Sequence, residues 1–411
     1  MQSGTAATVR DAVAAYEREI VGLTTRLVSV ASENPPGQRY RECADLLVEA
    51  LGALDLSPRL VETSIAGEEE PRWCVQGSTG GGGRCLYLHG HYDVVPAQNA
   101  EQFEPVVEAG RIRGRGSADM KGGLAAMLYA VAALRDLGVE LDGQVCFNFV
   151  PDEETGGRGG SRVLAERGVL APNGAGMLTP EPTGGVVWNA NRGALTFELT
   201  VHGREAHVGH AHAGVNAFER MLDVAGALRE LAAEVAGHST SYAIEPPAAR
   251  RSILLVGGRS ESGSGFNVVP ARCSFTVDRR PNPEESLQQE RERLLATLEP
   301  FREQGYEIDV ELLQEGDAAG SNEQDPLAVA LAASVAEVEG APPRFELCPG
   351  LLETRWYAGA GVPAFAYGPG RLDVSHGPDE DVEIDALIRC ATVYALTIRR
   401  RLGSQVSGLS P

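Results

Sequence analysis

The stretch CLYLHGHYDVVP (residues 85–96) passes from an apolar run, 85–88, directly into histidine and aspartate. A short apolar run of this kind is typical of a buried strand. Similar runs occur at 145–150 and around Met177-Leu178, and the segment GGLAAMLYAVAALRDLG (122–138) is strongly helical. Alternating strands and helices indicate an α/β layered sandwich, in which ligands gather at the carboxyl ends of the strands.

The rest of the chain divides into a continuation of this domain and an insert. A helix is predicted over 11–32, ending near the Asn-Pro-Pro-Gly turn at 34–37. Residues 191–317 are interpreted as two helices on a four-stranded antiparallel sheet, and residues 1–190 and 318–411 as one domain. The last residues, 403–411, are predicted to be disordered. Within the insert, strands are predicted at 194–203, 252–256, 273–277 and 308–313 and a helix at 217–236; after it, helices are predicted at 327–339 and 385–401.

The composition excludes several classes of partner. At 411 residues the chain is long enough for two or more domains. Its 57 acidic and 36 basic residues give a formal charge of −21, which repels nucleic acid and anionic membranes.

The first residues show neither a signal peptide nor a spanning segment, so a cytoplasmic location is predicted. The seven scattered cysteines form no CxxC pair and are interpreted as buried apolar residues.

Five polar clusters supply histidine, aspartate and glutamate, the ligand types that suit zinc, cobalt and manganese. In an extended segment His91 and Asp93 point to one face, so Asp93 can orient a metal-binding His91. A solvated turn at the end of a strand explains the same motif equally well. The clusters are HGHYDVVP (89–96), GRGSADMKGG (114–123), PDEETGG (151–157), TPEPTG (179–184) and SHGPDEDVEI (375–384).

Three carboxylates in these clusters suggest specific chemistry. Asp119 lies among small residues, where a carboxylate can bridge two ions; the alternative is an acid that only interacts with a helix dipole. The neighbouring Glu153 and Glu154 repel each other unless a cation or a proton separates them. One can bind metal while the other takes a proton from water, as in metal-assisted hydrolysis. Glu181 and His376 are weak signals when taken singly.

Taken in order, the clusters closely resemble the dinuclear zinc aminoacylase and carboxypeptidase family, which includes acetylornithine deacetylase, succinyl-diaminopimelate desuccinylase and glutamate carboxypeptidase. The resemblance runs from about Asn34 to Glu383. It implies a three-layer zinc-exopeptidase-like catalytic domain with an inserted lid and dimerisation domain, and hence a homodimer. It also implies two divalent metal ions per chain, zinc foremost, with cobalt or manganese as alternatives. The implied roles are that His91 and Glu181 bind one ion, Glu154 and His376 bind the other, Asp119 bridges them, Asp93 orients His91, and Glu153 is the general base.

The resemblance also assigns roles within the insert. His207, in GREAHVGHAH, matches the histidine that reaches the other subunit's active site and polarises the scissile carbonyl. Asn267 and Arg280 match positions that line the substrate site. The neighbouring His210 and His212 suggest a separate histidine metal site, which we disfavour because such histidines are usually polar surface residues.

The chain departs from the family pattern in two places. Many relatives have Gly-Gly-Thr-Asp-Ala or Asp-Thr-Arg where this chain has GLLETRW (350–356), so Glu353 replaces the aspartate and Leu351 and Leu352 replace glycines. The proline that usually follows the lid histidine is absent from GHAH (209–212). Both departures leave the metal set intact and leave the substrate pocket undefined.

The expected reaction is hydrolysis of the amide bond of an N-acyl amino acid. Glu153 takes a proton from the attacking water and returns it to the leaving amine, while metal and His207 stabilise the oxyanion. A carboxypeptidase or dipeptidase with the same residues is an alternative, because these enzymes differ mainly in pocket shape. Glutamate rather than aspartate at position 181 resembles the deacylase and carboxypeptidase branches of the family more than the aminopeptidase branch. A non-catalytic dimeric scaffold is a third interpretation.

Overall fold

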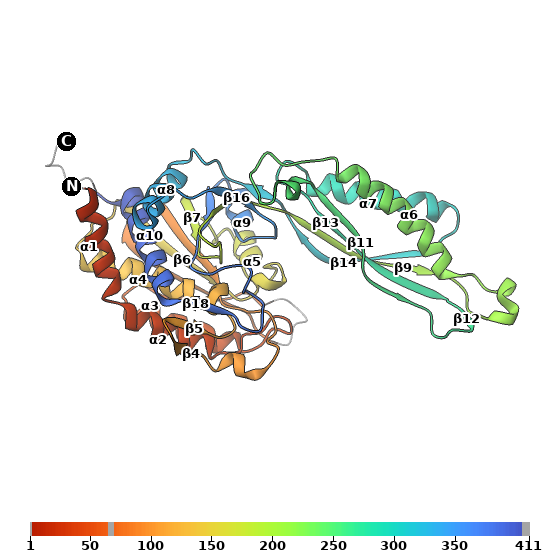
Figure 1. Cartoon of the computed structure of the whole chain (residues 1–411), viewed down its shortest axis with the longest axis horizontal. Helices are drawn as coiled ribbons and strands as arrows, with labels where there is room; N and C mark the ends of the chain where they lie inside the picture. Colours follow the sequence, from red (N-terminus) through yellow and green to blue (C-terminus); the bar gives the residue numbers. More distant parts are fainter. Residues whose placement is uncertain (1, 65–69, 405–411) are drawn as a thin grey trace. The chain divides into compact units, whose positions relative to one another are not determined.

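The computed structural model describes residues 2–64 and 70–404, and it contains two compact units (Figure 1). The first unit comprises Met1–Asn189, Gly320–Phe345 and Glu353–Pro411, and the second comprises Ala190–Ala319 and Glu346–Leu352. The predicted division instead assigns residues 190, 318–319 and 346–352 to the catalytic domain. Of the residues predicted to be disordered, 405–411 lie outside the described part of the chain. The prediction is wrong for Gly403, which pairs with Leu141, and for Ser404, whose N–H donates to the Glu140 backbone oxygen at 2.9 Å.

A mixed sheet is built from β1 (Arg59–Glu62), β2 (Trp73–Gly81), β3 (Cys85–His91), β6 (Gly143–Val150), β7 (Gly174–Thr179), β8 (Val187–Asn191), β15 (Ala319–Gly320), β16 (Phe345–Cys348) and β17 (Ala364–Ala366). Its residues belong to the first unit except for 190–191 of β8, 319 of β15 and 346–348 of β16, which belong to the second. The strand order is β1-β2-β6-β3-β7-β17-β8-β15, with β16 also paired to β8. β3 is parallel to β6 and β7, and β17 is parallel to β7. β2 is antiparallel to β6. The four strands β6, β3, β7 and β17 therefore end at the same edge.

Helices cover both faces of this sheet (Figure 1). One face carries α1 (Gln2–Ala14), α2 (Glu17–Val28), α3 (Tyr40–Ala53), α4 (Gly122–Asp136), α8 (Pro326–Glu339) and α10 (Ile384–Leu402). The other face carries α5 (Ser161–Glu166) and α9 (Thr354–Gly359). α4 is buried almost all round, as its nearly continuous apolar sequence requires. This arrangement confirms the predicted three-layer α/β class.

The local predictions for this unit are confirmed with one exception. The strands predicted at 85–88, 145–150 and around 177–178 are β3, β6 and β7, and the helices predicted at 122–138, 327–339 and 385–401 are α4, α8 and α10. The single helix predicted over 11–32 is wrong, because α1 ends at Ala14 and α2 begins at Glu17. At this break the Tyr16 ring packs 5.2 Å from the Tyr129 ring of α4, a tertiary contact that apolar spacing does not reveal.

The second unit is an antiparallel sheet packed against two helices. The sheet has the order β11 (Ile253–Ser262), β13 (Arg272–Arg280), β9 (Ala194–His202) and β14 (Ile308–Gly316), and the helices are α6 (Ala217–Val235) and α7 (Leu287–Glu303). The Asn216 side chain accepts hydrogen bonds at the start of α6, and the Ser286 hydroxyl accepts one at the start of α7. The predicted α+β insert is confirmed.

The remaining elements are short. The first unit contains a small sheet of β4 (Val106–Glu108), β5 (Arg111–Arg113) and β18 (Asp381–Glu383), and the second pairs β10 (Ala206–His207) with β12 (Val268–Val269). Single helical turns occur at η1 (Ala100–Phe103), η2 (Ser117–Lys121), η3 (Glu153–Thr155), η4 (Val208–Ala213) and η5 (Pro247–Arg250). Within residues 2–64 and 70–404, no helix has the length and apolar character needed to cross a bilayer. All seven cysteines are free thiols, and six of them are buried as predicted, whereas Cys146 is half-buried.

Candidate metal centre

The strand ends bring the polar clusters of the sequence to one edge of the first unit's sheet. β3 ends at His91, Glu153 and Glu154 follow β6, and Glu181 follows β7. His376 comes after β17, which is parallel to β7. Because parallel strands end at a common edge, residues far apart in sequence meet there.

The turn that carries Glu181 packs closely against the start of α4. A Cβ atom added to Gly123 would lie 2.5 Å from the Cβ of Pro180, so a side chain does not fit at this position. Glycine therefore permits the contact between the segment that follows Asp119 and the segment that precedes Glu181.

Five of the predicted site residues form two groups with the spacing of metal ligands. The first group is His91, Asp119 and Glu181, and the second is Asp119, Glu154 and His376; in each, the potential ligand atoms lie within 4.8 Å of one another. Asp119 belongs to both groups. This grouping is the one that the family resemblance implies, and the roles of the residues as ligands remain a prediction.

The two carboxylate oxygens of Asp119 each face one imidazole. Its Oδ1 lies 3.2 Å from Nε2 of His91, and its Oδ2 lies 3.3 Å from Nε2 of His376. The same His376 nitrogen lies 3.3 Å from Oε2 of Glu154. Asp119 thus has the geometry that a bridging carboxylate requires.

Asp93 contacts both His91 and the backbone of the loop that contains Glu153 and Glu154. Nδ1 of His91 lies 3.0 Å from the backbone oxygen of Asp93 and 3.3 Å from its carboxylate. The Asp93 carboxylate also accepts hydrogen bonds from the backbone N–H groups of Glu153 and Glu154, each at 3.1 Å, and from the Asn34 amide at 2.9 Å. These contacts leave Nε2 of His91 directed at Asp119 and fit the predicted orienting role of Asp93.

The electrostatics of the cluster favour bound cations. Within the described part of the chain, the buried Oε1 atoms of Glu154 and Glu181 have no hydrogen-bond partner. Burial raises the pKa of Glu153, Glu154 and Glu181, and the negative charges of nearby carboxylates add to the effect, with Asp119 the foremost of these for Glu154 and Glu181. A cluster of buried carboxylates with free lone pairs and two imidazoles fits a pair of divalent ions.

The pKa shifts of the two histidines and of Asp119 favour the charged forms of these groups, whereas those of the three glutamates favour the neutral forms. Burial disfavours the charged form of His91, but its hydrogen bonds to Asp119 and Asp93 raise its pKa well above the usual value. Hydrogen bonds to Asp119 and Glu154 raise the pKa of His376 to about 10. Burial disfavours the ionised form of Asp119, yet hydrogen bonds from both histidines hold its pKa below the usual range. In the metal-free protein, the protonated imidazoles therefore stabilise the ionised form of Asp119.

Metal binding should consequently release protons. His376 is protonated below about pH 10 without metal, and it must lose that proton to become a ligand. We expect at least one proton to be released per chain at pH 7, with affinity rising about tenfold per pH unit for each proton released. Calorimetric titration of the metal-free protein in buffers of different ionisation enthalpy measures this number. A pH-independent affinity between pH 6 and about 9 would contradict it.

A buried ion pair is hydrogen-bonded to the backbone at Asp119 and at His376. Arg115 and Glu380 lie 2.6 Å apart with side chains that are 1% and 0% exposed. Glu380 accepts hydrogen bonds from the backbone N–H groups of Ala118 and Asp119, both at 3.0 Å, and Arg115 donates to the backbone oxygen of His376 at 3.2 Å. The pair therefore connects the backbones of two candidate ligands.

Replacing Glu380 with Ala should destabilise the first unit by about 3–5 kcal/mol, because it leaves the buried Arg115 guanidinium without its counter-ion. Chemical denaturation of the metal-free protein measures the change. Glu49→Ala is the control, because it removes an exposed partner of Arg26 and should change the free energy of unfolding little. Equal effects of the two substitutions would show that the buried pair is not structurally important.

The predicted site residues of the insert lie in the second unit. His207 is exposed on β10, and its Nδ1 accepts a hydrogen bond from the Gly209 N–H at 3.1 Å. Arg280, on β13, donates to the Asp278 carboxylate at 3.0 Å. The backbone oxygen of Asn267 accepts a hydrogen bond from the Val208 N–H at 2.9 Å. Their roles in catalysis and substrate binding remain predictions.

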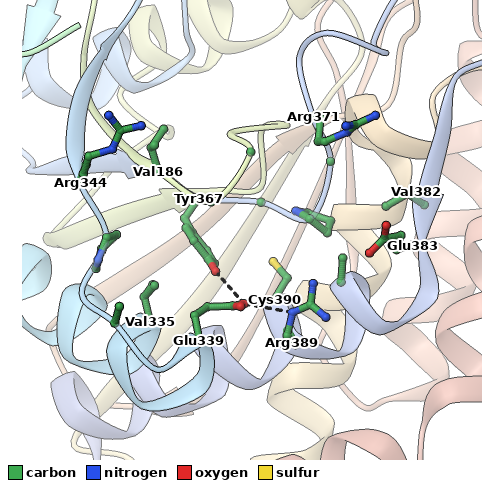
Figure 2. A pocket seen from close by; sticks show the side chains of 18 of the residues that line it. Val186, Val335, Glu339, Arg344, Tyr367, Arg371, Val382, Glu383, Arg389 and Cys390 are labelled. Atoms are coloured by element: carbon green, nitrogen blue, oxygen red, sulfur yellow. Dashed lines mark hydrogen bonds and ion pairs between the residues drawn. The ribbon is translucent and has the colours of Figure 1, made fainter. Parts of the chain in front are cut away.

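A separate cavity of about 500 Å³ lies in the first unit (Figure 2). Its walls include residues 184–186, which follow Glu181, and 367–371, which precede His376. Figure 2 shows the Tyr367 hydroxyl and Arg389 bonded to Glu339 on one wall, at 3.4 and 3.1 Å. None of the predicted site residues lines this cavity, so it is distinct from the metal centre.

Residues 87–400 match Peptidase family M20/M25/M40, and the chain belongs to this family. This assignment confirms the family membership that the sequence resemblance implied, and it identifies the protein as a hydrolase of a metallopeptidase family whose relatives act on amide and peptide bonds. The chain is 29% identical to a succinyl-diaminopimelate desuccinylase of Pseudoalteromonas atlantica over 93% of this chain and 99% of that protein. It is 28% identical to an acetylornithine deacetylase of Myxococcus xanthus over 80% of this chain and 84% of that protein.

Solved structures of the same family share the fold. The metallo-carboxypeptidase Sso-CP2 of Sulfolobus solfataricus superimposes with a TM-score of 0.76 over 93% of this chain and 99% of that chain, at 18% identity. A Bacillus subtilis protein described as a dinuclear metal-binding peptidase superimposes with a TM-score of 0.65 over 93% of this chain and 98% of that chain, at 16% identity. At these identities the likeness establishes the fold and leaves the substrate undefined.

Proposed function

We propose that the protein is a dinuclear metal-dependent amidohydrolase that removes the acyl group from a small N-acyl amino acid. The single observation that supports this proposal best is the pair of three-residue groups that share Asp119. The names of the relatives, a desuccinylase and a deacetylase, favour deacylation of an amino acid over cleavage of a longer peptide. A metallocarboxypeptidase or dipeptidase activity is the alternative.

In this proposal His91 and Glu181 hold one ion, Glu154 and His376 hold the other, and Asp119 contacts both. Zinc is the proposed metal, and cobalt and manganese are the alternatives. The bound ions would lower the pKa of a water molecule and polarise the substrate carbonyl.

Glu153 is the proposed general base. Burial raises the pKa of its carboxyl well above the usual value, and the neighbouring charges of Glu154 and Glu353 add to this effect while the charge of His91 opposes it. A carboxylate with a raised pKa accepts a proton from the attacking water more readily than an ordinary glutamate. Once protonated, the same group donates that proton to the nitrogen of the departing amino acid.

The remaining parts of the proposal concern the second unit and the assembly. His207, supplied by a second copy of the chain, stabilises the oxyanion, and Asn267 and Arg280 bind the carboxylate end of the substrate. This requires a homodimer, which we propose together with a cytoplasmic location. His207→Ala should then lower kcat without changing the metal content, which an activity assay and metal analysis check together.

A substrate panel tests the function. N-acetyl, N-formyl, N-succinyl and N-carbamoyl amino acids are assayed beside dipeptides, each with zinc, cobalt or manganese added to the metal-free protein. Turnover of an N-acyl amino acid supports the deacylase, and turnover of dipeptides alone supports the alternative. Failure on every amide, together with an absence of bound metal, would favour a scaffold.

A further inference from the structure

Glu353 is a buried carboxylate outside the candidate ligand set, with a side chain that is 1% exposed. Its Oε2 accepts hydrogen bonds from the Ser161 hydroxyl and from Nε2 of His89, the latter at 3.2 Å. Its Oε1 accepts one from the Trp356 indole at 3.2 Å and lies 3.5 Å from the Arg355 guanidinium. Both oxygens thus have polar or charged partners, as a buried charge requires.

Through His89, the Glu353 carboxylate is bonded to strand β3. The Asn148 amide donates to the Tyr357 hydroxyl at 2.7 Å, and that hydroxyl lies 3.1 Å from Nδ1 of His89. Because the ionised Glu353 carboxylate can only accept, Nε2 of His89 carries the hydrogen; in the neutral imidazole Nδ1 is then the acceptor, and the Tyr357 hydroxyl donates to it. His89 lies two residues before His91 in the same strand. Glu353 is thus bonded to the strand that ends in a candidate ligand.

Arg355 and the Glu353 carboxylate also contact the loop that follows Glu153 and Glu154. Arg355 donates to the backbone oxygen of Gly156 at 2.9 Å. A Cβ atom added to Gly157 would lie 2.6 Å from Oε1 of Glu353, so the loop backbone rests directly on the carboxylate. The positive φ of Gly157, 68°, also favours glycine at this position.

The charge of Glu353 is maintained by its partners. Burial alone would raise the pKa of this carboxyl, but the hydrogen bond from His89 and the positive charge of Arg355 lower it to about 2. Ionised Glu353 therefore accepts from the strand and from the start of α5 at the same time.

We propose that Glu353 is a positioning residue whose carboxylate fixes the loop 153–157 relative to the strand that ends in His91. The inference rests on the proposed function, because it concerns the placement of the general base beside a metal ligand. Glutamate has the reach for this task. An aspartate at this position would withdraw the carboxylate by about 1.5 Å, one carbon–carbon bond, from Ser161 and His89.

Two substitutions test the proposal, and both are assayed as metal-loaded protein on a hydrolysed amide. Glu353→Asp shortens the side chain, and Ser161→Ala removes the hydroxyl that donates to Glu353 and lies 3.4 Å from Nε2 of His89, while it leaves the carboxylate in place. We expect kcat to fall roughly 10–100-fold in Glu353→Asp and less in Ser161→Ala, as for other groups that orient metal ligands. KM should change less than about threefold, since the substrate is still bound when the base is misplaced.

Ser334→Ala is the matched control. It also removes a buried hydroxyl of the first unit, one that donates to the Ala330 backbone oxygen at 2.8 Å within α8. A merely structural role of Glu353 would lower thermal stability and leave kcat per folded, metal-loaded molecule unchanged. That result in both Glu353→Asp and Ser161→Ala would overturn the proposal, and Ser161→Ala alone decides if Glu353→Asp does not fold.

Amide hydrogen exchange provides a readout that does not depend on activity. Exchange of residues 153–161 should be faster in both variants than in the wild type and in Ser334→Ala, because the loop loses its attachment. Unchanged exchange would refute the attachment even if the wild type hydrolyses many amides. If the wild type hydrolyses none, the proposed function fails, while faster exchange still supports the structural attachment.

Discussion

A Glu153→Gln variant should lose about 10²–10⁴-fold in kcat and still bind two metal ions, because the amide keeps the size of the side chain but cannot accept a proton. Steady-state kinetics and metal analysis of the same preparation measure both properties. The carboxylate of Glu153 belongs to neither group of candidate ligands, so metal content should be independent of this substitution.

Glu166→Gln is the control for Glu153→Gln. Glu166 is an exposed residue of α5 that pairs with Arg162 at 2.9 Å, and its neutralisation should leave kcat unchanged. Activity within about tenfold of the wild type in Glu153→Gln would remove this residue from the role of general base.

An Asp119→Ala variant should lose tight binding of both ions and, with it, all measurable hydrolysis. Asp119 is the member that the two candidate groups share, so its removal takes a ligand atom from each ion. Loss of groups that merely orient ligands weakens metal binding about 10–100-fold, and loss of a shared ligand should cost at least the upper end of that range. Competition with a chromophoric chelator measures the affinity.

The His376→Ala variant shows how the loss of a residue from one candidate group differs from the loss of Asp119, which belongs to both. His376 belongs to one group alone, so this variant should retain one tightly bound ion per chain. Asp142→Ala, which removes an exposed carboxylate paired with Arg84, is the control and should retain two. Retention of two ions by Asp119→Ala at wild-type affinity would contradict the shared site.

The core of the fold could be predicted because its signals are local. The apolar runs at 85–88 and 145–150 end at polar residues, and this pattern alone predicts two buried strands, although it leaves open whether the polar residues are ligands or a solvated turn. Since parallel strands share an edge, the convergence of His91 with Glu154 required no knowledge of the loops. The structure agrees with both steps.

What sequence reasoning missed are partners defined only by tertiary contact. Asn34 contacts Asp93, and Glu380 caps the backbone at Asp119, across long separations in the chain. Glu380 lies in the SHGPDEDVEI segment, but no periodicity or spacing relates it to Arg115. In the sequence Glu353 is visible only as a departure from the family pattern, and nothing there gives its partner His89 a role. A buried charge needs a partner, yet the sequence does not say which residue provides it.

The interrupted order of the first unit has a consequence for how the protein is made. β17 lies between β7 and β8 in the sheet, although it is translated after the whole second unit, and His376 follows it. A nascent chain that stalls before this strand leaves β7 with an open edge and its cluster of acids without the second imidazole. Such fragments should aggregate through the open strand or be degraded, and hydrolase activity should appear only when translation of the C-terminal segment is complete.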